Sequence, residues 1–75
     1  MAMNEVRVVQ VGVGYWGPNL LRNLVSSPRF VVKAVIEKAE ARREFVRSRY
    51  PGIDVRADFS TALKDPEVDA VVIAT

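Results

Sequence analysis

The sequence predicts an α/β fold with a four-stranded parallel sheet of order 3-2-1-4 and three helices, in the chain order β-α-β-α-β-α-β. Three observations predict it. Short apolar runs alternate with segments of helical periodicity, the longest runs are apolar enough for strands covered on both faces, and a glycine-rich turn follows the first run. Such an alternation gives a parallel sheet with right-handed crossovers.

The first strand and helix are predicted over residues 6–11 and about 16–26. Four valines leave the strand little polar surface, and Leu20, Leu21, Leu24 and Val25 recur at helical spacing. Pro18 suits the first turn of the helix, because an N–H there has no helical partner. The pair Ser27-Pro28 ends the helix.

A second strand is predicted over residues 30–36 and a second helix from about residue 39 to 49. In that helix Ala41, Phe45 and Val46 are expected to face inward, with the charged residues outward. Tyr50-Pro51-Gly52 ends the helix.

The remaining elements are shorter. A third strand is expected over residues 55–57, and a brief third helix begins at Ser60, a plausible N-cap, and ends at Asp65-Pro66. The fourth strand, residues 70–74, is as apolar as the first. The first two helices should cover one face of the sheet and the third should cross to the other.

A glycine-rich turn, Gly12-x-Gly14-x-x-Gly17, joins the first strand to the first helix. Gly12 lets the chain turn sharply, Gly14 lets a pyrophosphate approach the backbone, and Gly17 lets the helix pack closely on the strand. The free N–H groups and positive dipole end of that helix attract phosphate. The turn therefore predicts a dinucleotide site in half of a Rossmann fold.

Glu37 ends the second apolar run, 20 residues after Gly17, which is the spacing of a ribose-binding acid. A carboxylate there bonds the 2′-hydroxyl of NAD and repels the 2′-phosphate of NADP, so NAD is the expected cofactor; the adjacent Lys38 weakens that preference. Two alternatives are an ordinary strand-end acid and a site for S-adenosylmethionine, against which the glycine spacing argues. The expected cofactor contacts are Gly12, Val13, Gly14, Tyr15, Trp16, Gly17, Glu37 and Lys38, although packing or loop shaping is favoured over stacking for Tyr15 and Trp16.

The composition narrows the class of protein. A chain of 75 residues is shorter than a complete doubly wound fold, so a single partial dinucleotide-binding domain over residues 1–75, without a substrate domain, is expected. Neither cysteine nor histidine occurs, which excludes a disulfide framework and thiolate metal sites and removes the commonest general base. With no secretory pattern and no run of roughly 18 apolar residues, we expect a cytoplasmic protein without metal or membrane partner.

The net charge of +2 includes five basic residues between Lys38 and Arg49. Glu40 and Glu44 lie three residues before Arg43 and Arg47, a spacing typical of ion pairs on a helix surface. No aromatic stacking pattern accompanies these bases. The pattern favours a solvated helix face over a nucleic-acid interface.

Residues 11–23, Val-Gly-Val-Gly-Tyr-Trp-Gly-Pro-Asn-Leu-Leu-Arg-Asn, resemble the glucose-fructose oxidoreductase and inositol dehydrogenase family, also called Gfo/Idh/MocA. The residue pattern of this segment is most similar to that of members acting on nucleotide sugars, such as UDP-N-acetylglucosamine 3-dehydrogenases. Residues 65–75 resemble the fourth strand of the same family. The resemblance implies that Ala74 and Thr75 border the cofactor, and that Glu37 stands where the family often has Asp.

In that family a Glu-Lys-Pro motif supplies the catalytic lysine, and these 75 residues contain no Lys-Pro pair. The resemblance thus implies cofactor contacts here and no catalytic residue. The expected function is an NAD(H)-binding fragment of a nicotinamide-dependent sugar or nucleotide-sugar oxidoreductase, able to bind and inactive alone. The alternative is a self-associating structural module with a vestigial site. An apolar fourth-strand edge beside a partly covered sheet face predicts a homo-oligomer.

Overall fold

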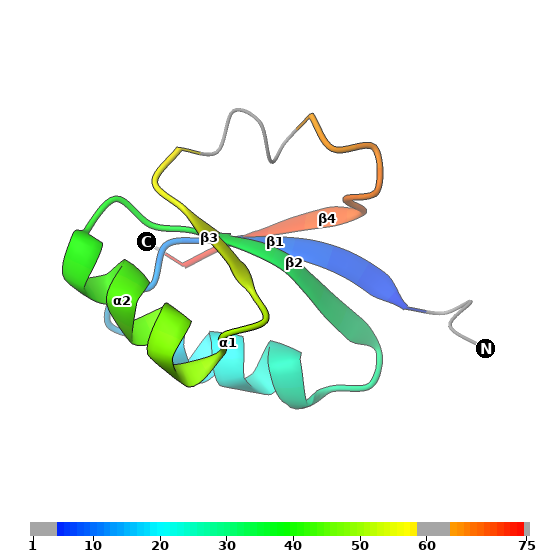
Figure 1. The fold of residues 1–75 in the computed structure, drawn as a ribbon. Helices are drawn as coiled ribbons and strands as arrows, with labels where there is room; N and C mark the ends of the chain where they lie inside the picture. The colour runs from blue at the N-terminus through cyan, green and yellow to red at the C-terminus, as the bar shows by residue number, and fades with distance from the viewer. Residues whose placement is uncertain (1–4, 59–63, 75) are drawn as a thin grey trace.

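A single parallel sheet with two helices on one side makes up the described part of the chain (Figure 1). The computed structural model describes residues 5–58 and 64–74. The elements are β1 (Val6–Val11), α1 (Gly17–Ser26), β2 (Phe30–Ile36), α2 (Glu40–Arg49), β3 (Asp54–Arg56) and β4 (Ala70–Ile73). The strands lie in the order β3-β2-β1-β4, which confirms the predicted order.

Most element boundaries agree with the sequence-based prediction. The first two strands agree at both ends. Strand β3 lies one residue earlier than predicted at both ends, because its pairing with β2 runs from Asp54 to Arg56. Although β4 ends at Ile73, the Ala74 amide still donates to the Val11 carbonyl at 2.8 Å. The third helix expected from Ser60 falls largely on residues 59–63 and lies outside the described residues.

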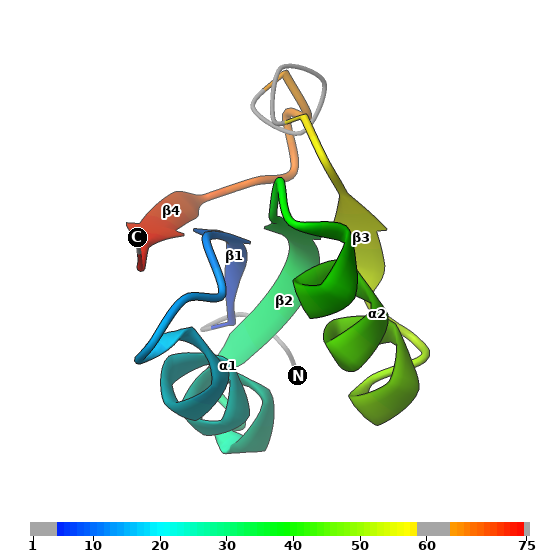
Figure 2. The ribbon, with the colours of Figure 1, turned by 90° about the vertical axis from the view of Figure 1, so that its left-hand side faces the viewer.

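The two faces of the sheet are covered differently, as Figure 2 shows. Helices α1 and α2 lie on one face, whereas the described parts of the β3–β4 connection pass over the other. On the helix-covered face the buried core consists of Val13, Leu21, Val35 and Val46. On the opposite face it consists of Val9, Ala34 and Ile36, with Val11 and Val68 partly buried against them.

The inward face predicted for α2 was wrong in two of its three residues. Val46 is fully buried, but Ala41 is exposed and Phe45 is 40% exposed, with the Arg49 guanidinium 6.0 Å from its ring centroid. The reason is that residues after the helix supply the missing cover, since Tyr50 and Ile53 pack against the core on this face.

Strand β4 is an edge strand with an apolar outer surface. Val71 and Ile73 lie opposite Val9 and Val11 in the parallel register and are 41% and 71% exposed. Parallel partners point to the same side of a sheet, so these side chains extend the face that the helices do not cover. Within the described ranges, neither helix is long and apolar enough to cross a membrane.

Candidate functional site at the glycine-rich turn

The glycine-rich turn lies at the carboxyl end of β1 and leads directly into α1. Gly12 has a φ of 95°, in the left-handed region that favours glycine, and its amide donates to the Ile36 carbonyl at 2.7 Å. This bond fastens the start of the turn to the end of β2. The sharp turn assigned to Gly12 from the sequence is therefore confirmed.

Gly14 and Gly17 are glycines for different reasons. A Cβ on Gly17 would lie 3.2 Å from the Gly12 carbonyl oxygen, so a larger residue would push the helix away from the turn. A Cβ on Gly14 would come no closer than 3.8 Å to the nearest atom, the Ala74 carbonyl oxygen. Protein packing thus leaves room for a side chain at Gly14, and the free space suits a group that approaches the backbone closely, such as a pyrophosphate.

The amides at the start of α1 provide donors for such a group. Within residues 5–58 and 64–74, no protein acceptor pairs with the amides of Gly14, Tyr15 and Trp16. Trp16 is the N-cap residue and makes no side-chain capping bond. These N–H groups and the positive end of the helix dipole suit an anion.

Gln10 is a buried polar residue beneath the turn. Its Nε2 donates to the carbonyls of Gly12 and Gly17, both at 3.0 Å, and the residue is 0% exposed. These bonds tie the turn and the first residue of α1 to β1. Its Oε1 is buried and has no hydrogen-bond partner among residues 5–58 and 64–74.

Glu37 follows β2 and points toward the turn. One carboxylate oxygen accepts the Val13 amide at 2.7 Å, and the other accepts the Ala39 amide at 2.9 Å. Burial alone would raise the pKa of Glu37, but these backbone N–H bonds and the charge of Arg42 outweigh it and hold the pKa below its ordinary value. The carboxylate stays ionised near neutral pH and has lone pairs left for further donors.

A cavity of about 350 Å³ opens beside Glu37, and Lys38, Arg42 and Gly14 also line it.

Arg43 fixes the local backbone, since its guanidinium donates to the carbonyls of Glu37 and Lys38 at 2.9 and 2.7 Å. The sequence spacing predicts a pair of Arg43 with Glu40, but the Arg43 guanidinium bonds these two carbonyls instead. The predicted Glu44–Arg47 pair is confirmed, at 2.5 Å.

Tyr15 and Trp16 are exposed, so the packing role favoured for them alongside loop shaping is wrong. Tyr15 is 91% exposed and Trp16 is 68% exposed. Their rings meet edge to face with centroids 5.6 Å apart. The core below the turn is filled by Val13 and Leu21. The two rings therefore lie outside it, beside the amides of the turn that have no acceptor among the described residues.

The other expected contacts are placed as follows. Val13 is buried in the core and its amide is bonded to Glu37, so this residue shapes the turn from inside. Ala74 lies beside Gly14 at the end of β4. Thr75 lies outside the described residues. The structure thus brings the glycine turn, Glu37, Lys38 and Ala74 together at the carboxyl ends of three neighbouring strands, where ligands bind in open α/β sheets.

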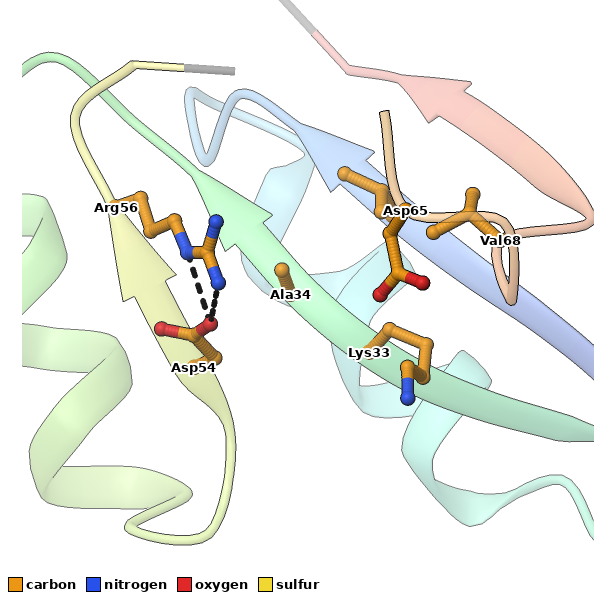
Figure 3. A pocket seen from close by; sticks show the side chains of 7 residues that line it. Lys33, Ala34, Asp54, Arg56, Asp65 and Val68 are labelled. Atoms are coloured by element: carbon orange, nitrogen blue, oxygen red, sulfur yellow. Dashed lines mark hydrogen bonds and ion pairs between the residues drawn. The ribbon is translucent and has the colours of Figure 1, made fainter. Parts of the chain in front are cut away.

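A second cavity, of about 260 Å³, lies on the opposite side of the sheet (Figure 3). Among its charged lining residues, Arg56 pairs with Asp54 at 2.8 Å, and Lys33 pairs with Glu67 beside the cavity at 2.7 Å. The Asp65 carboxylate accepts the Glu67 amide at 2.9 Å. None of its described lining residues belongs to a glycine turn or a helix N-terminus, which are the features expected of a phosphate site.

Sequence reasoning missed three contributors to the site: Gln10, Arg42 and Arg43. A signal for Gln10 was present, because it is the one amide in an otherwise apolar stretch just before Gly12. The roles of Arg42 and Arg43 depend on how the loop after β2 folds back, which spacing alone does not show.

Comparison with known proteins gives a family match. The family model described as "Oxidoreductase family, NAD-binding Rossmann fold" (Gfo/Idh/MocA) matches residues 6–75. An inositol 2-dehydrogenase of Mycolicibacterium smegmatis is 38% identical over 74 residues, which cover 97% of this chain and 21% of that protein. One of Rhodococcus jostii is 35% identical, over 96% of this chain and 20% of that protein. The chain thus spans about a fifth of these relatives.

Two solved structures share the fold. GenD2 from gentamicin A biosynthesis, solved in complex with NAD, is 28% identical with a TM-score of 0.85, over all of this chain and 21% of its own. The apo scyllo-inositol dehydrogenase of Lactobacillus casei has a TM-score of 0.83 over all of this chain and 22% of its own, and at 20% identity it supports the fold alone.

Proposed function

Since the chain belongs to the Gfo/Idh/MocA oxidoreductase family, with its NAD-binding Rossmann fold, we propose that these 75 residues bind NAD(H) as part of a nicotinamide-dependent polyol or sugar oxidoreductase. The observation that carries the proposal is the free space at Gly14. Its missing side chain leaves space at the turn, beside amides that have no acceptor among the described residues. When bound, the nicotinamide of such a cofactor accepts or donates a hydride.

Each part of the cofactor would have its own contacts. The pyrophosphate would lie over Gly12, Gly14 and Gly17, held by the outward amides. The adenosine ribose would lie against Glu37 in the cavity that Lys38 also lines. Ala74, and by resemblance Thr75, would border the cofactor. The exposed rings of Tyr15 and Trp16 would then stand at the edge of the cofactor.

The relatives favour one substrate class over another. Two inositol 2-dehydrogenases at 38% and 35% identity favour a polyol, with a nucleotide sugar as the alternative suggested by the Tyr-Trp-Gly motif. We expect the 75-residue chain to bind cofactor without turnover, because it has no histidine and no Lys-Pro pair to supply an acid or base. Formation of NADH from inositol by the purified chain would contradict this expectation.

Calorimetric titration of the chain with NAD and with S-adenosylmethionine tests the binding proposal. We expect NAD to bind, and S-adenosylmethionine, which has no pyrophosphate, to bind far more weakly. Equal affinity for both would favour a general nucleoside site. Binding of neither would favour the alternative, a structural module with a vestigial site.

Self-association is a further part of the proposal. The exposed Val71 and Ile73 on edge strand β4 form an apolar strip that a second copy could cover. Ile73→Lys would place a charge on this strip without disturbing the half-buried Val72 on the other face. Sedimentation should show an oligomer that this variant weakens. A monomer at high micromolar concentration would contradict the proposal.

A further inference from the structure

The peptide between Gly12 and Val13 is held on both sides by buried side chains. Gln10 Nε2 donates to its carbonyl oxygen at 3.0 Å, and its N–H donates to Glu37 Oε1 at 2.7 Å. In a trans peptide the carbonyl and the N–H point in opposite directions, so the two side chains grip the same plane from opposite edges. Rotation of this peptide would break both bonds.

Gln10 also reaches the helix. Its Nε2 donates to the Gly17 carbonyl at 3.0 Å, while the Gly17 amide donates to the Gly14 carbonyl at 3.2 Å. One amide group therefore sets the position of α1 relative to the turn. Only the nitrogen end of a glutamine can donate to two carbonyl oxygens, so the orientation of this side chain follows from its surroundings.

Stability alone does not explain a glutamine here. The residue is completely buried, and its Oε1 has no partner in the described part of the chain. A buried acceptor without a partner lowers stability, and replacing a buried polar group together with its partners by apolar groups of the same shape is often neutral or stabilising. A functional benefit would account for the choice of an amide, and residues that reduce stability are typical of functional sites.

We propose that Gln10 is a positioning residue for the pyrophosphate of the cofactor: together with Glu37 it fixes the Gly12–Val13 peptide, and through Gly17 it fixes the first turn of α1, so that the outward amides already have the geometry that the phosphates need. The inference rests on the proposed function, because it concerns the same NAD site. Gln10 touches no cofactor atom; it acts through the backbone that does.

The test compares ligands that use the turn with one that does not. Gln10→Met should weaken NAD and ADP binding about tenfold, which corresponds to about 1.4 kcal/mol. It should also lower the melting temperature, because the buried Gly12 carbonyl loses its donor. Adenosine has no phosphate and should bind as before. Val32→Ala, a truncation in the partly buried shell of the same face, is the matched control and should lower stability without changing the NAD-to-adenosine affinity ratio.

Two ligand-free measurements accompany the titrations. The side-chain amide hydrogens of Gln10, the one glutamine in the sequence, should exchange slowly in the parent chain, and the Val13 amide should exchange faster in Gln10→Met.

Rapid exchange of the Gln10 amide, or a Gln10→Met variant that loses affinity for all three ligands equally, would overturn the inference. So would an unchanged NAD affinity. If the parent binds NAD and only the variant result fails, the proposed function stands without this inference; if the parent binds nothing, both fall.

Discussion

The inner and outer sides of the glycine-rich turn differ in how their polar groups are paired. On the inner side, the Gly12 carbonyl, the Gly12 amide and the Val13 amide bond to Gln10, Ile36 and Glu37, respectively. On the outer side, the amides of Gly14, Tyr15 and Trp16 have no acceptor within the described part of the chain. The comparison teaches that one side holds the turn in place and the other is free for a ligand.

The largest effect is expected on the outer side. Gly14→Val should abolish NAD binding, because the valine side chain would fill the space that the phosphates need. The fold should be kept, because a Cβ at this position comes no closer than 3.8 Å to another protein atom. Calorimetry measures the binding, and circular dichroism checks the fold. Gly52→Val is the matched control, since a Cβ at Gly52 meets no atom within 4 Å. Normal NAD affinity in Gly14→Val would place the site elsewhere.

On the inner side, a substitution should lower the free energy of unfolding. Gly12→Ala forces a side chain into a left-handed conformation, which costs roughly 1–2 kcal/mol. Urea unfolding should show this loss for Gly12→Ala and a much smaller one for Gly14→Ala. Equal losses in the two variants would remove the distinction between the two sides.

Cofactor choice should change at Glu37. Replacement by Ala removes the carboxylate that disfavours a 2′-phosphate and leaves Lys38 and Arg42 in the cavity. We expect the NAD-to-NADP affinity ratio to fall about tenfold, the effect of about 1.4 kcal/mol. Glu40→Ala removes an exposed acid at the start of α2 and serves as the control. A ratio that is the same in Glu37→Ala and the parent would exclude Glu37 from this role.

The smallest effect concerns pH. The folded-state pKa of Glu37 is depressed, so its contribution to stability is complete above its ordinary value of 4.5 and is lost as the pH falls through the lower folded-state value. Glu37→Gln should therefore flatten the fall in stability below about pH 4.5. Asp69, whose pKa is lowered by hydrogen bonds from Arg7, contributes in the same direction, so Asp69→Asn supplies the comparison. An unchanged acid slope in Glu37→Gln would contradict this assignment.

The features that the sequence predicted are those that depend on local pattern. The apolar runs located β1 and β2 to the residue, and the glycine spacing located the turn. The exposure of Phe45 could not be read from periodicity, because it depends on Tyr50 and Ile53 packing from beyond the helix. The inward bonds of Glu37 were equally out of reach, since they require the loop after β2 to lie against a turn 24 residues earlier in the chain.

The measurement that tests the account most directly is a titration of the isotope-labelled chain with NAD, followed by amide chemical shifts. The account predicts that the largest shifts fall on residues 12–17, with smaller ones at Glu37 and Lys38 beside the ribose. Shifts concentrated instead around Lys33, Asp54 and Val68, which line the cavity on the opposite face of the sheet, would contradict it. The absence of any shift at millimolar NAD would contradict it equally.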